Sequence, residues 1–334
     1  MSDLRPILAA DLGGTLIKLG IVHGGRVVAQ KVIPARSHEP LAERLPELED
    51  EWSTLAKSIG FMATACGGIG LSFPSIIDPA TGRVLTHFGK YTDAPQLDLQ
   101  EWARARFGLA LSIENDARAA LIGEWQCGAG RGCDDLVMIT LGTGIGTAAV
   151  CGGQPLRGAH GQACGVGGHF TLNHAGGVCE VCGNIGCAEH EASTAALPRL
   201  AAELPGLADS ALSCEAKLDY AAVFRLAADG DACAVQLRDD ALRVWSATAA
   251  NLVLAYDVSR VVIGGGIAEA PELVPTIREH IHRHALTPWG KVEVVRSELG
   301  DAAALLGCEW IGRHAERVDV RGETRSILPS SRAL

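Results

Sequence analysis

The sequence has no apolar run long enough to span a bilayer. Its first residues, Met1 to Pro6, lack a basic region followed by a long apolar stretch, so we expect no signal peptide. Positive charge is also scarce: 29 Lys and Arg stand against 39 Asp and Glu, which gives a formal net charge of -10. Nucleic-acid and anionic-membrane surfaces need clustered Lys and Arg. We therefore expect a cytoplasmic protein with neither nucleic acid nor membrane as a partner.

Cysteine does not form the pattern of a disulfide framework, because its 11 copies are an odd number and most are scattered. One cluster differs: Cys179, Cys182 and Cys187 lie close together, and His169 precedes them. Three thiolates and one imidazole satisfy tetrahedral zinc without an open position. The cluster therefore predicts a structural zinc site. The alternative is three reduced cysteines beside an unrelated histidine.

With 334 residues, 48% of them hydrophobic, the chain is too long for one small core and is expected to form two domains. A strand, a glycine-threonine turn, a second strand and a hairpin are expected over residues 4–34. The same order returns over residues 136–156. Two such units predict a duplicated α/β core with a cleft between its halves.

The first glycine turn is Asp11 to Thr15, directly after a short apolar run. Glycine removes the Cβ atom, so a phosphate group can approach the N–H groups of Gly13 and Gly14. Thr15 adds a hydroxyl donor, and Asp11 is a candidate ligand for a magnesium ion or its waters. The turn predicts a phosphate loop, with a plain glycine hairpin as the alternative.

The second turn, Leu141 to Thr147, has the same composition. Two such turns facing each other across a cleft would surround a triphosphate with N–H donors, which predicts ATP contacts at Gly142, Thr143 and Gly144. This differs from a Walker loop, because no Lys-Ser/Thr pair follows the last glycine.

A third glycine run, Gly264 to Gly266, follows an apolar strand pattern. It predicts that the backbone approaches an adenine nucleotide at Gly265 and Gly266, with a helix N-terminus just beyond. A tight strand-to-helix turn is the alternative.

Glu114-Asn115-Asp116 is expected between a strand and a helix. In a phosphoryl-transfer cleft, Asp116 would be the base that takes the proton from the attacking hydroxyl. Asn115 would hold a neighbouring hydroxyl. A simple helix cap is the alternative for this pair.

Together these residues resemble the ROK family of sugar kinases and repressors, within the actin-like ATPase superfamily, over about residues 7–312. The resemblance implies an α/β, two-domain actin-like ATPase fold (a duplicated ribonuclease-H-like fold) with a zinc-binding loop at 169–189. It also implies transfer of the ATP γ-phosphoryl group to a sugar hydroxyl, with Asp116 as base and magnesium present. Glu189 matches a glutamate that contacts the sugar, and His169 would bind both zinc and sugar.

The implied domains are a small α/β domain over residues 1–118, completed by a helix at 301–312, and a large α/β domain over residues 119–300. A flexible tail is expected over 313–334. The domains should close on the substrate, as such kinases must to exclude water. The family also implies a homodimer.

Three departures from the family pattern bear on the substrate. The segment that usually carries a sugar-binding glutamate reads Cys164 to His169 here, and Gly165 or Val166 stands in the glutamate position. The loop that usually carries an Asn-Leu sugar contact reads Phe88 to Asp93 and contains Lys90. The first cysteine pair is Cys-x-x-Cys instead of Cys-x-Cys. We expect intact phosphoryl-transfer machinery with a rebuilt pocket, in which Lys90 favours a substrate with a polar or anionic substituent.

Two other functions remain open. A sensor or degenerate kinase of the ROK type is favoured by the missing glutamate, although a DNA-binding segment would not fit between Met1 and Asp11. A nucleotide-dependent dehydrogenase would need a Gly-x-Gly-x-x-Gly sequence opening a helix, which is missing at Asp11. The sequence also leaves open whether the phosphoryl donor is ATP or polyphosphate.

Overall fold

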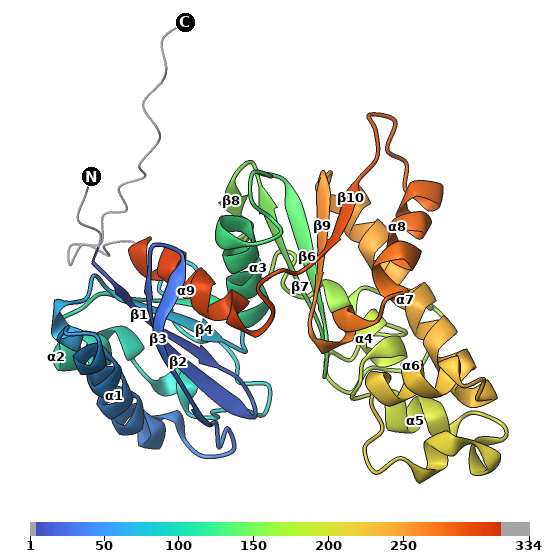
Figure 1. Ribbon diagram of the computed structural model, residues 1–334, viewed down its shortest axis with the longest axis horizontal. Helices are drawn as coiled ribbons and strands as arrows, with labels where there is room; N and C mark the ends of the chain where they lie inside the picture. The colour runs from blue at the N-terminus through green and yellow to red at the C-terminus, as the bar shows by residue number, and fades with distance from the viewer. Residues whose placement is uncertain (1–4, 315–334) are drawn as a thin grey trace, which may run out of the picture.

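Two five-stranded mixed sheets form two lobes that lie side by side in the computed structural model, which describes residues 5–314 (Figure 1). This arrangement is the predicted α/β fold. No helix among the described residues is long and apolar enough to cross a membrane. From position 315 onward, the predicted tail lies outside the described residues. Its first residue, Arg313, belongs instead to the last helix, α9 (Ala303–Arg313).

The first sheet has the strand order β3-β2-β1-β4-β5 and starts with the predicted three-strand meander. Its central strand β1 is apolar and buried, and the indole N–H of Trp52 on α1 donates to the Ala9 carbonyl 3.0 Å away. The elements of this lobe are β1 (Ile7–Leu12), β2 (Leu16–His23), β3 (Arg26–Pro34), α1 (Leu41–Ser58), β4 (Ile69–Phe73), α2 (Leu99–Phe107) and β5 (Leu111–Asn115).

The register of this sheet gathers polar side chains at one edge. In the parallel pairs, Asp11 is opposite Ser72, and Ser72 is opposite Glu114. Because β1, β4 and β5 run in the same direction, their carboxyl ends meet at this edge, which is where parallel sheets place ligands.

The second sheet has the order β10-β9-β6-β7-β8. Its strands are β6 (Leu136–Leu141), β7 (Ile145–Cys151), β8 (Gln154–Pro155), β9 (Arg260–Gly264) and β10 (Glu293–Arg296). Thr140 at the end of β6 pairs with Gly264 at the end of the parallel strand β9, so the second and third glycine segments leave the sheet as neighbours.

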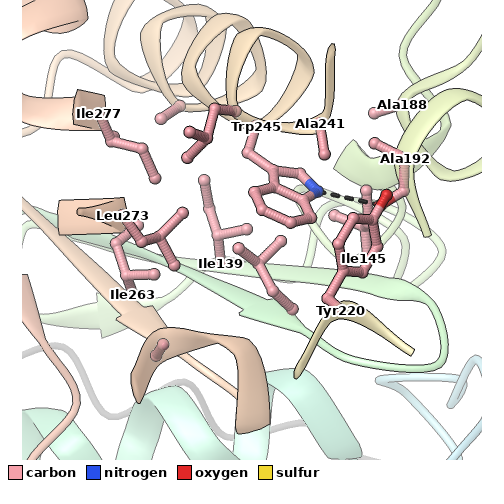
Figure 2. Packing of buried hydrophobic residues seen from close by; sticks show 14 of the residues in the cluster. Ile139, Ile145, Ala188, Ala192, Tyr220, Ala241, Trp245, Ile263, Leu273 and Ile277 are labelled. Carbon is pink, nitrogen blue, oxygen red and sulfur yellow. Dashed lines mark hydrogen bonds between the residues drawn. The ribbon is translucent and has the colours of Figure 1, made fainter. Parts of the chain in front are cut away.

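The core of the second lobe is built around Trp245 on the long helix α7, whose indole N–H donates to the Ala192 carbonyl at 3.1 Å (Figure 2). Tyr220 stacks against this indole edge-on, with ring centroids 4.7 Å apart. The helices of this lobe are α4 (Ala188–Ala192), α5 (Leu197–Ala202), α6 (Tyr220–Ala228), α7 (Ala232–Tyr256) and α8 (Leu273–His284).

The lobes are joined twice. Helix α3 (Asp116–Cys127) leads from the first sheet to the second, and the segment after β10 returns to α9, which packs on β1 through Leu305 and Cys308. Where α3 crosses α9, Gly123 and Gly307 bring the two backbones together, because a Cβ atom on either glycine would overlap a carbonyl oxygen of the other helix. Glycine is therefore required at this crossing.

One buried carboxylate, that of Glu124 on α3, ties both connections together. Its Oε2 accepts the N–H of Ala129 at 2.8 Å, next to the chain leaving α3. Its Oε1 accepts the N–H of Leu299 at 2.8 Å and the hydroxyl of Ser297, in the returning segment. The side chain is fully buried, and these bonds satisfy its charge.

We expect Gly307→Ala to destabilise the fold by about 2–3 kcal/mol, because the added methyl group must push α9 away from α3. Gly67→Ala is the matched control, since its methyl group would meet Arg5 at an ordinary 3.4 Å. Urea unfolding of both variants measures the difference. Equal stabilities for the two variants would contradict the close helix crossing.

Candidate active site

Asp116 is the first residue of α3 and lies at the carboxyl edge of the first sheet. Its Oδ1 accepts the N–H of Ala117 at 2.8 Å and the amide of Asn115 at 3.0 Å. Its Oδ2 has no hydrogen-bond partner among the described residues. One oxygen thus fixes the carboxylate, and the other is free to accept a proton.

The surroundings raise the pKa of Asp116 above its usual range. The side chain is exposed to solvent, yet protein atoms crowd it, and this desolvation is the largest cause of the shift. The negative charge of Asp11 raises the pKa further, while the Ala117 N–H, the charge of Lys90 and the Asn115 amide lower it. A carboxylate whose pKa is raised in this way is a stronger base than an ordinary aspartate.

Asn115 serves mainly as the cap of α3. Its Oδ1 accepts the N–H of Arg118 at 3.2 Å, and its amide N–H groups donate to the Ser75 carbonyl and to Asp116. The helix-cap alternative for this dipeptide therefore describes Asn115, one residue earlier than Asp116. Only the second lone pair of Oδ1 is left for a sugar hydroxyl, so its predicted contact with substrate stays a prediction.

The backbone N–H groups of the first glycine turn fall into two kinds, one bonded within the turn and two left without a partner among the described residues. The N–H of Gly13 donates to the carbonyls of Asp11 and Leu16, at 3.2 and 3.0 Å, and so closes the turn. The N–H groups of Gly14 and Thr15 have no partner among the described residues. These two, rather than Gly13, are the donors that a phosphate could use.

Asp11 is half-buried at the same edge, and its Oδ1 accepts the hydroxyl of Ser72 at 2.7 Å. Burial raises the pKa of Asp11, and the Ser72 hydrogen bond and the charge of Lys18 lower it in part. A desolvated carboxylate next to Asp116 creates a local excess of negative charge, which a bound cation would relieve.

Lys90 lies over the first glycine turn. A Cβ atom placed on Gly14 would be 2.9 Å from its Cε and 3.3 Å from its Nζ. Its charge also acts on Asp116. The structure thus places Lys90 beside the predicted phosphate loop, whereas the sequence suggested the sugar pocket.

The second glycine turn reaches the same site from the other lobe. Gly146 packs against Ala117, next to Asp116, because a Cβ atom on this glycine would be 3.1 Å from the Ala117 methyl carbon. The N–H of Gly142 donates to the Gly144 carbonyl, while those of Thr143 and Gly144 have no partner among the described residues. Thr143 and Gly144 are therefore its available donors.

Glu189, on the first turn of α4, supports this second turn. Its Oε2 accepts the N–H of Ile145 at 2.9 Å and would lie 2.6 Å from a Cβ atom on Gly144. Glu189, predicted as a sugar ligand, thus also holds the hairpin that carries the available N–H groups of Thr143 and Gly144. Sequence reasoning missed this second role, because nothing in the motif indicates which backbone group the glutamate faces.

The third glycine segment has two distinct parts. Gly265 has a positive φ of 85°, and a Cβ atom there would overlap the Leu141 carbonyl, so this glycine fits the segment against the second turn. A Cβ atom on Gly266 or Gly142 would meet nothing within 4 Å, so these two residues border open space. The expected helix N-terminus is a 3₁₀ turn, Gly266–Glu269, since α8 starts only at Leu273.

A buried charged cluster of Glu114, Arg118 and Arg157 supports the chain just before the Cys164–His169 segment, in which the family glutamate is missing. Arg118 donates to Glu114 at 2.6 Å and to the Gly161 carbonyl at 3.1 Å, and Arg157 donates to the other Glu114 oxygen at 2.8 Å. Glu114 and Arg118 are almost fully buried. Glu114 lies in β5 and Arg118 on α3, so no helical spacing rule in the sequence indicated this pair.

The segment itself places Gly165 against Arg118, with 3.4 Å between a Cβ atom on this glycine and Nη2. The Thr147 hydroxyl donates to the Cys164 carbonyl and accepts the N–H of Gly167 at 2.8 Å. These bonds fix the backbone without a carboxylate at Gly165 or Val166.

The histidine and three cysteines converge as the sequence predicted. The ligand atoms of His169, Cys179, Cys182 and Cys187 all lie within 4.8 Å of one another. Cys187 Sγ is 3.9 Å from both Cys182 Sγ and His169 Nδ1. Zinc–sulfur bonds of about 2.3 Å in a tetrahedron place sulfurs about 3.8 Å apart, so this donor set fits zinc.

The chain is similar to known proteins over almost its whole length. The ROK family model matches residues 7–315. A glucokinase of Halalkalibacterium halodurans is 31% identical over 336 residues, covering 96% of this chain and 99% of that protein. The chain belongs to the ROK family.

Two further similar proteins are a kinase and a repressor. The crystal structure of a ROK family glucokinase from Streptomyces griseus, in complex with glucose and AMPPNP, superimposes with a TM-score of 0.72 at 29% identity, over 92% of this chain and 99% of that one. A xylose repressor of Caldicellulosiruptor bescii is 29% identical over 92% of this chain and 77% of that protein. The kinase relatives identify this ROK protein as a carbohydrate kinase with the two-domain actin-like ATPase fold.

We expect Cys182→Ser to reduce the zinc content well below about one ion per chain and to lower Tm, because one of four ligands is lost. Cys182 is exposed, so the substitution costs little packing. Cys214→Ser, at another exposed cysteine outside the cluster, should change neither quantity. Elemental analysis and thermal unfolding, with and without a chelator, measure the effect. Unchanged zinc content in Cys182→Ser would contradict the site.

Proposed function

We propose that this ROK-family chain transfers the γ-phosphoryl group of ATP to a hydroxyl of a sugar or sugar derivative, with Asp116 as the general base. The observation that carries the proposal is the geometry of this carboxylate. One oxygen is fixed by Ala117 and Asn115, and the other is free. Gly146 of the second glycine turn packs against Ala117, and the charges of Asp11 and Lys90, at the first turn, act on this carboxylate.

The chemistry follows from this arrangement. The free Oδ2 of Asp116 accepts the proton of the sugar hydroxyl, while the hydroxyl oxygen attacks the γ-phosphorus. The free N–H groups of Gly14, Thr15, Thr143 and Gly144 bind phosphate oxygens and need no reorganisation as charge develops. Closure of the lobes excludes water from the reacting groups.

Magnesium fits the residues of the first lobe. Asp11 offers a half-buried carboxylate whose pKa burial raises, beside the second carboxylate of Asp116. Such a pair favours a divalent cation or its waters. When bound with ATP, the ion would neutralise charge on the phosphates, and Asp11 is the residue that would hold it.

The acceptor pocket supports a sugar that differs from an ordinary hexose at one edge. Asn115, His169 and Glu189 remain as candidate sugar ligands, and no carboxylate stands at Gly165 or Val166. Hydroxyl groups at that edge would lose a charged partner, which penalises substrates that carry them. Because Lys90 lies by the phosphate turn, it does not support the anionic substituent that the sequence suggested.

A non-catalytic ROK-type sugar sensor is the second candidate. It is favoured by the missing carboxylate and by the similarity to a repressor, while the retained Asp116 and both donor turns favour the kinase. The homodimer, the absence of a nucleic-acid partner and a cytoplasmic location, which would keep the cysteine ligands reduced, stay predictions.

The deciding experiment is a coupled ADP-release screen across aldoses, ketoses, amino sugars, polyols and acidic sugars, run with ATP and with polyphosphate. We expect one class to be phosphorylated with ATP, and Asp116→Asn to lower kcat by at least about 10²-fold. No turnover with any acceptor and either donor would favour the sensor, and glucose as the best substrate would contradict the altered pocket.

Asp116→Asn should not lower the stability of the fold. The raised pKa means that the folded protein binds the proton more tightly than the unfolded chain does, so ionised Asp116 disfavours folding at neutral pH. Removing the charge should leave Tm equal or higher at pH 7. Thermal unfolding measures this, and a lower Tm would assign any loss of activity to unfolding.

The pH profile of the reaction gives an independent test of the base. Asp116 must be ionised to accept a proton, so kcat/KM should fall tenfold per pH unit on the acid side. The break should lie above the usual aspartate pKa of 3.8, because desolvation raises it. Residual turnover of Asp116→Asn should lack this break. A profile flat through this range would contradict the assignment.

A further inference from the structure

The loop that carries Lys90 has an unusual backbone. Phe88 and Tyr91 have positive φ angles of 43° and 48°, and Gly89 between them has a φ of 75°. Left-handed backbone is disfavoured for aromatic residues and persists only where the surroundings hold it in place. The surroundings of this loop therefore fix the direction in which Lys90 points.

Tyr91 supplies the main anchor. Its side chain is fully buried, and its hydroxyl donates to the Gly13 carbonyl at 2.9 Å. Its backbone N–H donates to the Ser37 carbonyl at 2.7 Å, and the Ser37 hydroxyl donates in turn to the Gly14 carbonyl at 2.7 Å. The loop is thus bonded directly to the first glycine turn.

The other end of the loop is fixed as well. Both carboxylate oxygens of Asp93 accept N–H groups from the start of α1, those of Leu41 at 2.6 Å and Ala42 at 3.0 Å. Lys90 directly precedes the Tyr91 anchor, and its own N–H donates to the His87 carbonyl at 2.8 Å. The loop backbone at Lys90 is therefore held in one place before any ligand binds.

The Lys90 ammonium group lies over Gly14, 3.3 Å from the position of a Cβ atom there. Among the described residues, no carboxylate lies within ion-pair distance of it. By contrast, Lys18 on β2 is paired with Asp301 at 3.3 Å. Within the part of the chain that the structure describes, Lys90 is thus a half-buried cation without an anionic partner, and it lies beside the turn whose N–H groups we assign to phosphate.

We propose that Lys90 binds the terminal phosphoryl group of the donor and stabilises its charge during transfer. This deepens the proposed function and rests on it. A nucleoside triphosphate with one magnesium ion keeps a net negative charge, and the glycine turns offer only uncharged N–H donors. Lys90 supplies a full positive charge on the side of the first turn.

In the reaction, a bond forms between the sugar oxygen and the γ-phosphorus, and the bond to the β,γ-bridging oxygen breaks. The electron pair of the broken bond stays on the ADP oxygen, and the proton of the sugar hydroxyl goes to Asp116. Lys90 keeps its proton throughout. It contacts the equatorial oxygens of the group in transit, where an ammonium group acts purely through its charge.

The test compares Lys90→Met, which removes the charge and keeps the length, with Lys90→Arg and with Lys57→Met. Lys57 is an exposed lysine at the end of α1 and serves as the matched control. Binding of magnesium-AMPPNP and of magnesium-ADP is measured by calorimetry for each protein. We expect Lys90→Met to weaken AMPPNP binding by about 10- to 100-fold and to leave ADP binding within about twofold.

Steady-state kinetics with the acceptor found by the screen provide the second readout. Lys90→Met should lower kcat by about 10²-fold with little change in KM for the sugar, and Lys90→Arg should recover part of the loss. Tyr91→Phe removes the hydroxyl bond to Gly13 and should lower kcat in the parent protein. It should have almost no further effect in Lys90→Met, because it acts by positioning the lysine.

Two results would overturn this proposal. Equal losses of AMPPNP and ADP affinity would remove Lys90 from the terminal phosphate. A raised KM for an acidic sugar at unchanged kcat would assign Lys90 to the acceptor. The binding measurements need no turnover, so they test Lys90 even if the screen finds no acceptor and the kinase proposal itself fails.

Discussion

The direct backbone contact between α3 and α9 is the constraint on which the site depends. Gly123 and Gly307 allow the two helices to touch without side chains between them. Helix α3 starts with Asp116, and α9 packs on β1, the strand that carries Asp11. The distance between Asp116 and the first glycine turn therefore depends on a helix crossing at Gly123, seven residues further along α3. A bulkier crossing would shift one group relative to the other.

The site combines two kinds of polar group that behave differently on ligand binding. The donors of the glycine turns are fixed by the backbone: Gly13 and Gly142 close the turns with their own N–H groups, and their neighbours are left free. Asp116 and Lys90 are charged. Ala117 and Asn115 hold the Asp116 carboxylate by hydrogen bonds, and Tyr91 holds the loop of Lys90 against the first turn. Both features reduce the reorganisation that phosphoryl transfer requires.

Much of the fold and part of the site could be predicted from the sequence. Apolar strands followed by glycine turns have a local cause, so the turns at Asp11 to Thr15 and Leu141 to Thr147 could be predicted, as could the convergence of the cysteine cluster. The ligands of these segments stay predictions. The separate roles within each turn could not be predicted. Whether Gly13 closes the turn or donates to a ligand depends on the position of Leu16, and Gly265 requires glycine because of Leu141 in another strand.

The position of Lys90 illustrates the same limit. The sequence placed this lysine in the loop expected to contact the sugar, and only the anchors Tyr91 and Ser37 hold that loop against the first turn. The Glu114–Arg118 pair was missed because the two residues lie on different elements, β5 and α3, so no helical spacing rule links them. Its burial under the segment around Gly161 comes from tertiary packing, which no local pattern encodes.

The buried carboxylate of Glu124 has a mechanical consequence. It accepts hydrogen bonds from Ala129, in the segment that leaves the first lobe after α3, and from Leu299, in the segment that returns to it before α9. The two connections are therefore pinned to one point instead of behaving as two independent linkers. Moving the two connections apart would break both sets of hydrogen bonds at once and leave the Glu124 carboxylate buried without partners.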